Sequence, residues 1–416
     1  MMPHEASARA AVLVVGDGIS GMTAAIEASE AGREVYLVEK APTLGGRVAR
    51  MHRYFPKLCP PTCGLEINFQ RLRKNPRIHV LVGTEVRAVE GGPGAFTVTL
   101  RTAPRYVTPA YGTTGQGVEA APEVPDDFNL GMSKRRALYL PSPMAFPMRY
   151  QIDEGAMPPA QLRAVAGACE PGLIDAEAEE RVFQVQVGAI VLATGWKPYD
   201  AAKLDGLGYG TCPDVVTNVM MERLAAIDGP TGGKVLRRSN GEPARTVAFV
   251  QCAGSRDENH LAYCSGVCCT GSLKQARYVR DADPEAKVEV FYIDLRAPGR
   301  LEDFLARVQT DANVTLTKGK VAEVTQEPGG QVVVVAEDVV GGGRVRRAFD
   351  LVVLATGIVP NAPGFKVPGL KPDEFGFLPG EGEGVFAAGC ARVPADVAAC
   401  VQDATGAALS ALVATA

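Results

Sequence analysis

The sequence has no excess of basic charge. Its 416 residues include 43 Lys and Arg against 47 Asp and Glu, which gives a formal net charge of −4 at pH 7. Proteins that bind nucleic acid need a basic face to neutralise phosphates. The charge balance therefore argues against that class of function.

The sequence also has no uninterrupted apolar run of the length that crosses a bilayer. The apolar C-terminal stretch is broken by Arg392, Asp396 and Asp403. The first ten residues do not combine a basic segment with an apolar one, as a secretion signal does. We therefore expect a cytoplasmic protein, attached to the inner face of the membrane, if at all, through a partner protein.

The residues that are present fit a globular protein of two or three domains, with 46% hydrophobic and 22% charged residues. Ten cysteines are unusual in a chain with no secretion signal, and four of them lie within residues 252–269. Clustered cysteines in a reducing compartment are typical of metal or redox chemistry. The cysteines are therefore the first place to look for function.

Residues 11–40 have the pattern of a strand, a glycine-rich turn, a helix and a second strand. The turn reads Gly16-Asp17-Gly18-Ile19-Ser20-Gly21, and Glu39 ends the second strand. This context is the dinucleotide-binding fingerprint. The glycines allow a tight turn and close approach of a pyrophosphate to the helix N-terminus, and Glu39 is expected to accept from a ribose hydroxyl.

The segments that follow favour FAD. Leu44-Gly45-Gly46-Arg47 looks like the extended FAD motif of two-dinucleotide-domain flavoproteins. The repeated Ala-Thr-Gly at 193–195 and 355–357 and the GVFAAG segment ending at Gly389 also resemble that class. The resemblance implies a set of cofactor-binding residues: Gly16, Gly18, Ser20, Gly21, Glu39, Lys40, Gly46, Arg47, Val86, Thr194, Gly195, Gly389 and Cys390.

Cys390 departs from that pattern, because these flavoproteins usually place Asp there to bond the ribityl chain. A thiol is a weak donor and does not replace a carboxylate. Either the sugar chain is held differently, or Cys390 has a redox role. A third interpretation is a small buried side chain without function. Isolated Cys400 is assigned no role.

The second α/β unit lacks the glycine fingerprint. Its first strand ends in Gln251-Cys252-Ala253-Gly254-Ser255, and Cys264, Cys268 and Cys269 follow. Four thiolates suit an iron–sulfur cluster or zinc, although the spacing is not that of ferredoxins. We predict a [4Fe-4S] cluster on Cys252, Cys264, Cys268 and Cys269. Zinc, or four buried cysteines without a metal, are the alternatives.

The stretch QCAGSRDENHLAYCSGVCC resembles the A subunits of heterodisulfide reductases, and so do LYLPSPMAFPMRYQID and LGYGTCPDVVTNVMMERL. The resemblance covers nearly the whole chain and implies FAD beside the cysteine-bound cluster. The compact form is similar to the A component of the quinone-interacting membrane-bound oxidoreductase complex of sulfate reducers. That similarity implies electron relay between menaquinol and adenylylsulfate reductase, with B- and C-type subunits as partners.

Cys59 and Cys63 flank two prolines just beyond the glycine pair, in a region that approaches the flavin in related proteins. They are candidate catalytic residues as a redox disulfide, or cluster ligands completed by a partner, or packed loop cysteines. Two other functions stay open. One is a stand-alone NAD(P)H-dependent disulfide reductase using this pair, and the other is a scaffold protein that binds FAD structurally.

The predicted fold is α/β, with two Rossmann-like dinucleotide-binding domains of the thioredoxin-reductase and glutathione-reductase type. The FAD-binding domain is expected to be discontinuous, formed by 1–225 and 346–416, with an insertion at about 103–185. Residues 240–345 are expected to form the second module, which carries the cysteine cluster.

Overall fold

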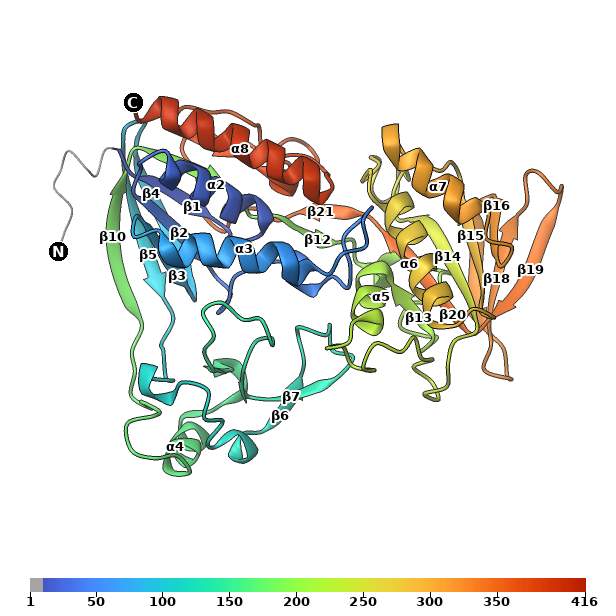
Figure 1. Ribbon diagram of the computed structural model, residues 1–416, viewed down its shortest axis with the longest axis horizontal. Helices are drawn as coiled ribbons and strands as arrows, with labels where there is room; N and C mark the ends of the chain where they lie inside the picture. The colour runs from blue at the N-terminus through green and yellow to red at the C-terminus, as the bar shows by residue number, and fades with distance from the viewer. Residues whose placement is uncertain (1–9) are drawn as a thin grey trace.

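The computed structural model describes residues 10–416. Figure 1 shows two α/β lobes side by side, with a third region that hangs below the first lobe. Each lobe contains a five-stranded parallel sheet and a three-stranded antiparallel sheet. The predicted α/β class with two Rossmann-like units is confirmed.

The sheet of the first lobe has the order β22–β11–β1–β2–β3. The central strands are short apolar runs, as a sheet covered on both faces requires. Their bounds are β1 Val12–Val15, β2 Val35–Glu39, β3 Ile78–Val82, β11 Ala189–Leu192 and β22 Val385–Ala387. Helices α2 (Ile19–Glu30), α3 (Pro61–Lys74) and α8 (Val397–Ala414) belong to this lobe.

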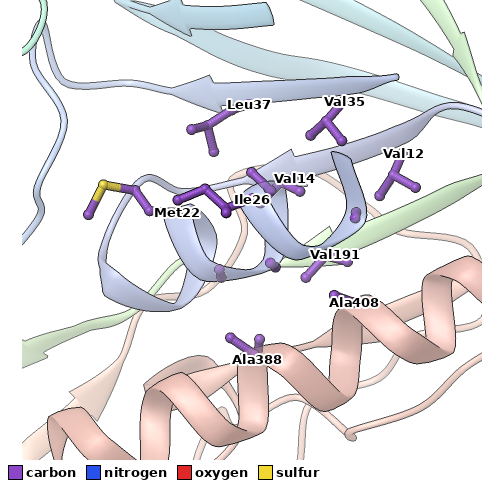
Figure 2. Packing of buried hydrophobic residues seen from close by; sticks show 14 of the residues in the cluster. Val12, Val14, Met22, Ile26, Val35, Leu37, Val191, Ala388 and Ala408 are labelled. Carbon is purple, nitrogen blue, oxygen red and sulfur yellow. The ribbon is translucent and has the colours of Figure 1, made fainter. Parts of the chain in front are cut away.

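Helix α2 packs on the sheet beside the C-terminal helix α8, which also contacts β11 and β22. Figure 2 shows Met22 and Ile26 of α2 facing the strand residues Val14 and Leu37, with Ala408 of α8 nearby. The small residues Ala404, Ala407, Ala408 and Ala411 form the buried side of α8, which lets the two helices approach closely. This packing fixes the N-terminus of α2 against the edge of the sheet.

By length and composition alone, α8 is apolar enough to cross a membrane, and among the described residues it is the one helix that is. Asp403 lies within this helix and Asp396 caps its N-terminus, and the helix is nevertheless apolar enough on average. In the fold, α8 is a packed helix of the first lobe that exposes Leu409 and Val413.

The second lobe repeats the design with a sheet of order β13–β20–β14–β15–β16. The strands are β13 Val215–Thr217, β14 Thr246–Ala253, β15 Lys287–Tyr292, β16 Val314–Lys318 and β20 Leu351–Thr356, and the helices are α5 Asn218–Ala225, α6 Cys268–Ala282 and α7 Glu302–Gln309. The strand before each Ala-Thr-Gly turn pairs with the central strand of its sheet, β11 with β1 and β20 with β14.

Each lobe also carries an antiparallel meander. In the first lobe it is formed by β4 (Thr84–Gly92), β5 (Ala95–Thr102) and β10 (Arg181–Val187), and in the second by β17 (Val321–Gln326), β18 (Val332–Glu337) and β19 (Arg344–Phe349). The second lobe is thus a structural copy of the first.

The chain crosses between the lobes twice, along the antiparallel ribbon of β12 (Trp196–Pro198) and β21 (Ile358–Pro360). This corrects the expected domain boundaries. Strands β13 and β20, which lie in the segments assigned to the FAD domain, pair within the second sheet. Apolar β-branched runs look alike in sequence whichever sheet they join, so the second lobe spans about 199–357 instead of 240–345.

The insertion leaves the meander after β5 and returns at β10. It contains β6 (Glu123–Pro125) paired with β7 (Lys134–Arg136), β8 (Leu138–Tyr139) paired with β9 (Gln151–Ile152), and α4 (Pro159–Gly167). It has its own apolar cluster around Tyr111, Leu138 and Val165. The region predicted to be an insertion is therefore a small packed unit (Figure 1).

Candidate flavin site and cysteine cluster

The glycine turn between β1 and α2 is built so that three backbone segments touch. Gly16 has φ +100°, and a Cβ there would lie 2.3 Å from the Ala193 carbonyl oxygen. A Cβ on Gly21 would lie 1.8 Å from the Gly16 carbonyl oxygen. Only glycine fits at either position, so the first role of both residues is close packing of strand, turn and helix.

Gly18 differs from these two glycines. It is the N-cap of α2 with φ −60°, and a Cβ there would meet no atom within 4 Å. Its backbone conformation is open to other residues, and the space beside it is not filled by protein. A bare backbone at a helix N-terminus suits the close approach of a phosphate.

Glu39 is held at the end of β2 by two backbone amides. Its Oε2 accepts from the Asp17 amide at 3.0 Å, and its Oε1 accepts from the Ala41 amide at 2.6 Å. Each carboxylate oxygen keeps a lone pair for a further donor. The side chain is therefore fixed in the position that the fingerprint reserves for a ribose hydroxyl.

Asp17 is a feature of this turn that the glycine motif does not reveal. Burial and the charge of Glu39 raise the pKa of Asp17 well above its usual range. Its Oδ2 is buried without a hydrogen-bond partner. The raised pKa favours the neutral form of this carboxyl, at a turn where the phosphates of a dinucleotide would lie.

A cavity of about 300 Å³ opens beside this turn. Nine of the predicted cofactor-binding residues line it: Gly16, Gly18, Ser20, Glu39, Gly46, Arg47, Thr194, Gly195 and Cys390. They come from the first turn, the glycine pair, the first Ala-Thr-Gly turn and the turn after β22. The structure thus brings together four motifs that are distant in sequence.

Arg47 and Trp196 form one wall of this cavity. The Arg47 Nε donates to the Trp196 carbonyl oxygen at 2.7 Å, and the guanidinium lies 4.7 Å from the indole centroid. Burial beside Arg50 lowers the pKa of Arg47 to about 10, so it stays cationic at neutral pH. Trp196, which follows the first Ala-Thr-Gly turn, therefore lies on the cavity wall.

Four predicted residues lie outside this lining. Lys40 does not line this cavity. It lines another cavity, of about 490 Å³, together with Val82 and Gly83. Gly21 serves packing, and a Cβ on Gly389 would lie 2.1 Å from Ser20 Oγ. The Val86 side chain is buried in the core.

The four clustered cysteines gather at the N-terminus of α6 and the end of β14. Cys268 and Cys269 begin α6, and Cys252 lies at the end of β14 with φ +56°. Burial, followed by the charges of Cys269, Cys252 and Cys264, raises the pKa of Cys268. Arg256 opposes the rise in pKa at Cys252 and Arg296 opposes it at Cys269 without cancelling it, and a metal centre would supply further positive charge to thiolates crowded in this way.

The donor set fits a thiolate-bound cluster, but the ligand sphere is not formed in advance. Within residues 10–416, no three Cys, His, Asp or Glu side chains stand where they jointly hold a metal ion. Cys268 Sγ points to the Thr356 carbonyl oxygen at 3.7 Å, and Cys269 Sγ to that of Asp294 at 3.6 Å. Ligation therefore requires these side chains to rotate.

Cys59 and Cys63 are not part of the cavity lining. Both side chains are exposed, and Cys63 lies in the first turn of α3. Cys59 Sγ lies 4.0 Å from the Lys57 carbonyl oxygen. Their use as a redox pair stays a prediction.

Fold and cavity together define an FAD-dependent oxidoreductase of the thioredoxin-reductase type. The family model for FAD dependent oxidoreductases matches residues 11–60. Thioredoxin reductase of T. acidophilum is 15% identical, with TM-score 0.53 and 97% of each chain covered. The Lactococcus lactis enzyme is 14% identical, with TM-score 0.53, covering 97% of this chain and 98% of its own.

The chain is similar, more particularly, to the A subunits of heterodisulfide reductases. It is 36% identical to an A-type iron-sulfur subunit of the CoB–CoM heterodisulfide reductase of Methanopyrus kandleri, over 97% of this chain and 64% of that one. It is 35% identical to the A-type subunit of the ferredoxin/F420H2-dependent CoB–CoM heterodisulfide reductase of Methanosarcina acetivorans, over 93% and 51% respectively. The chain thus spans less than two thirds of the length of these relatives.

Proposed function

We propose that this chain is the FAD- and iron–sulfur-containing electron-transfer subunit of a heterodisulfide-reductase-like complex. The observation that carries the proposal is the replacement at the start of α6, where four cysteines stand in place of a phosphate-binding glycine turn. A relative that is 36% identical over 97% of this chain is named an iron-sulfur subunit. The flavin exchanges electron pairs, and a cluster exchanges single electrons.

The residues of the chain have separate tasks in this function. Gly16 keeps the turn tight, Gly18 gives the dinucleotide a bare backbone, and Glu39 orients the ribose of the dinucleotide. Arg47 and Trp196 close the cavity wall. Cys252, Cys264, Cys268 and Cys269 hold the cluster after side-chain rotation, at the positive end of α6, which favours its negative charge.

The specific role proposed is relay of electrons between menaquinol and adenylylsulfate reductase in sulfate respiration. This role rests on the resemblance of the sequence to the A component of the quinone-interacting complex. The partners are B- and C-type subunits on the cytoplasmic face of the membrane. The complex isolated from membranes tests this role: the flavin should be reduced by a menaquinol analogue only when the partner proteins are present.

Cofactor content tests the assignment of flavin and cluster to this chain. Protein purified without oxygen should contain about one FAD and about four irons per chain. Cys268→Ser should lose the iron and keep FAD, because the two sites lie in different lobes. Cys212→Ser, at a buried cysteine outside the cluster, is the matched control and should keep both. Zinc in place of iron, or no metal, would overturn the proposal.

A further inference from the structure

Two buried cysteines meet in the wall of the flavin cavity. Cys390 lies in the turn after β22, and Cys400 lies in the first turns of α8. Their side chains are 4% and 5% exposed, and their sulfurs are 3.7 Å apart. Cys400, which has no assigned role in the sequence, is therefore the partner of the residue that departs from the flavoprotein pattern.

The pair is held at contact distance. Both sulfurs face the Ala395 carbonyl oxygen, Cys390 Sγ at 3.4 Å and Cys400 Sγ at 3.9 Å. A disulfide bond is about 2.05 Å long, so a modest side-chain rotation closes the gap. Of the ten cysteines, this is the pair whose sulfurs the structure brings into mutual contact.

The location connects the pair to the flavin. Both cysteines line the cavity that contains Gly16 and Arg47. They also line a second cavity of about 190 Å³ that reaches Val267 and Thr270 at the start of α6. The pair therefore lies between the place of the flavin and the N-terminus of the helix that carries the cysteine cluster.

We propose that Cys390 and Cys400 form a reversible disulfide that exchanges an electron pair with the flavin. In the oxidising direction the two S–H bonds break, one S–S bond forms, and two protons and two electrons leave. Oxidised FAD takes up both electrons and both protons and becomes FADH2. The reverse step opens the disulfide at the expense of reduced flavin.

The surroundings distinguish the two thiols. The contact between the two thiols lowers the pKa of Cys400 against the opposing effect of burial. The same contact, with burial, raises the pKa of Cys390. Cys400 is therefore the first of the two to ionise, and a thiolate is the form that enters disulfide chemistry.

Peptide mapping tests disulfide formation. FAD-loaded full-length protein is equilibrated without oxygen in oxidising and reducing glutathione buffers, quenched with acid, alkylated and cut with trypsin. Cleavage after Arg392 separates Cys390 from Cys400. The oxidised sample should contain the two peptides joined by one disulfide, and the reduced sample should contain both as alkylated thiols. Complete alkylation of both cysteines in every buffer would overturn the proposal.

Photoreduction tests the link to the flavin. Illumination with EDTA reduces the bound flavin, so electrons enter the protein by that route. In oxidised protein the Cys390–Cys400 disulfide should open as the flavin bleaches, whereas FAD-depleted protein should keep it. A disulfide that persists beside fully reduced flavin contradicts the exchange.

Two variants identify the linkage. Cys400→Ser should never yield the joined peptide and should leave Cys390 alkylated in all buffers. Cys212→Ser should behave as the wild type. If Cys400→Ser loses FAD through misfolding, the wild-type map and photoreduction still decide the matter. These measurements detect the Cys390–Cys400 disulfide directly. Their outcome is therefore independent of whether iron is found at the four cysteines of residues 252–269.

Discussion

The two lobes share an order of strands and differ in the turn that follows the first central strand of each. In the first lobe the turn after β1 is made of glycines and borders a cavity. In the second, β14 shifts register against β20 between Val250 and Ala253, and Cys252 adopts φ +56°. A non-glycine residue there costs about 1–2 kcal/mol.

The difference teaches that the strands and helices determine the framework, while a few turn residues determine what the framework can hold. Both lobes bury apolar strands in the same order. Both turns contain a residue with positive φ and both border a cavity, but in the second turn that residue is Cys252, so the backbone there is strained and a sulfur is presented. Backbone strain of this kind is typical of functional positions.

The largest expected effect tests the first turn itself. Gly16→Ala places a Cβ 2.3 Å from a carbonyl oxygen, so we expect a loss of about 3–5 kcal/mol of stability and loss of FAD. Thermal unfolding and flavin content measure both. Gly32→Ala is the control, because Gly32 has φ +95° but open space; it should cost about 1–2 kcal/mol and keep FAD.

Gly18→Ala separates the fold from the ligand. The new methyl group meets no protein atom within 4 Å, so the melting temperature of the FAD-free protein should be unchanged. The methyl group should hold the phosphate away from the backbone amides and so remove a charged hydrogen bond worth about 2–3 kcal/mol. Binding of FAD should therefore weaken about 30- to 150-fold. Titration calorimetry with FAD measures it. Unchanged affinity would show that the dinucleotide does not approach this backbone.

Gly254→Ala tests whether a Cβ in the second turn affects stability, FAD binding or both. Gly254 has φ +79°, and a Cβ would lie 2.8 Å from the Tyr199 ring. We expect a loss of about 2 kcal/mol in thermal unfolding with FAD content retained. Adding Tyr199→Ala removes the ring that the new Cβ meets. The double variant should therefore recover part of the stability that this clash costs the Gly254→Ala protein. A loss of FAD in Gly254→Ala would show that the lobes are not independent.

The smallest effect concerns Asp17. Its pKa is raised in the folded chain, so the wild type should lose stability as pH rises from about 4 until the raised pKa is passed, by about 1.4 kcal/mol per pH unit. Asp17→Asn should not show this loss. The variant should therefore melt higher at neutral pH, and the difference should vanish near pH 4. Thermal melts across this pH range measure the difference. Melting temperatures of the wild type and the variant that changed in parallel with pH would contradict the prediction.

Local patterns were enough to predict the first turn and its cofactor, because Gly16, Gly18 and Glu39 lie within one short unit whose spacing has a physical meaning. The resemblance to two-dinucleotide-domain flavoproteins, in which the repeated Ala-Thr-Gly takes part, also predicted two Rossmann-like units. The sheet that each strand joins was not predictable, because β13 and β20 are apolar runs of the same kind as β11.

Contacts between distant segments were also beyond the sequence. The pairing of Cys390 with Cys400 depends on how α8 packs against α2, and the exposure of Cys59 and Cys63 depends on where α3 begins. The pKa of Asp17 depends on Glu39, which is 22 residues away along the chain. Each is a consequence of tertiary packing, which local periodicity does not encode.

The ribbon of β12 and β21 gives the molecule a modular layout. At its base the Asn361 amide donates to the Gly195 carbonyl oxygen at 3.0 Å, and Thr194 Oγ1 donates to the Asn361 carbonyl oxygen at 2.9 Å. The chain therefore leaves the first lobe and re-enters it at one point. A change of strand length beyond that point therefore leaves the backbone pairing of the first lobe's sheet intact, provided that side-chain contacts between the lobes, such as that of Lys274 Nζ with the Arg53 carbonyl oxygen at 2.8 Å, are kept.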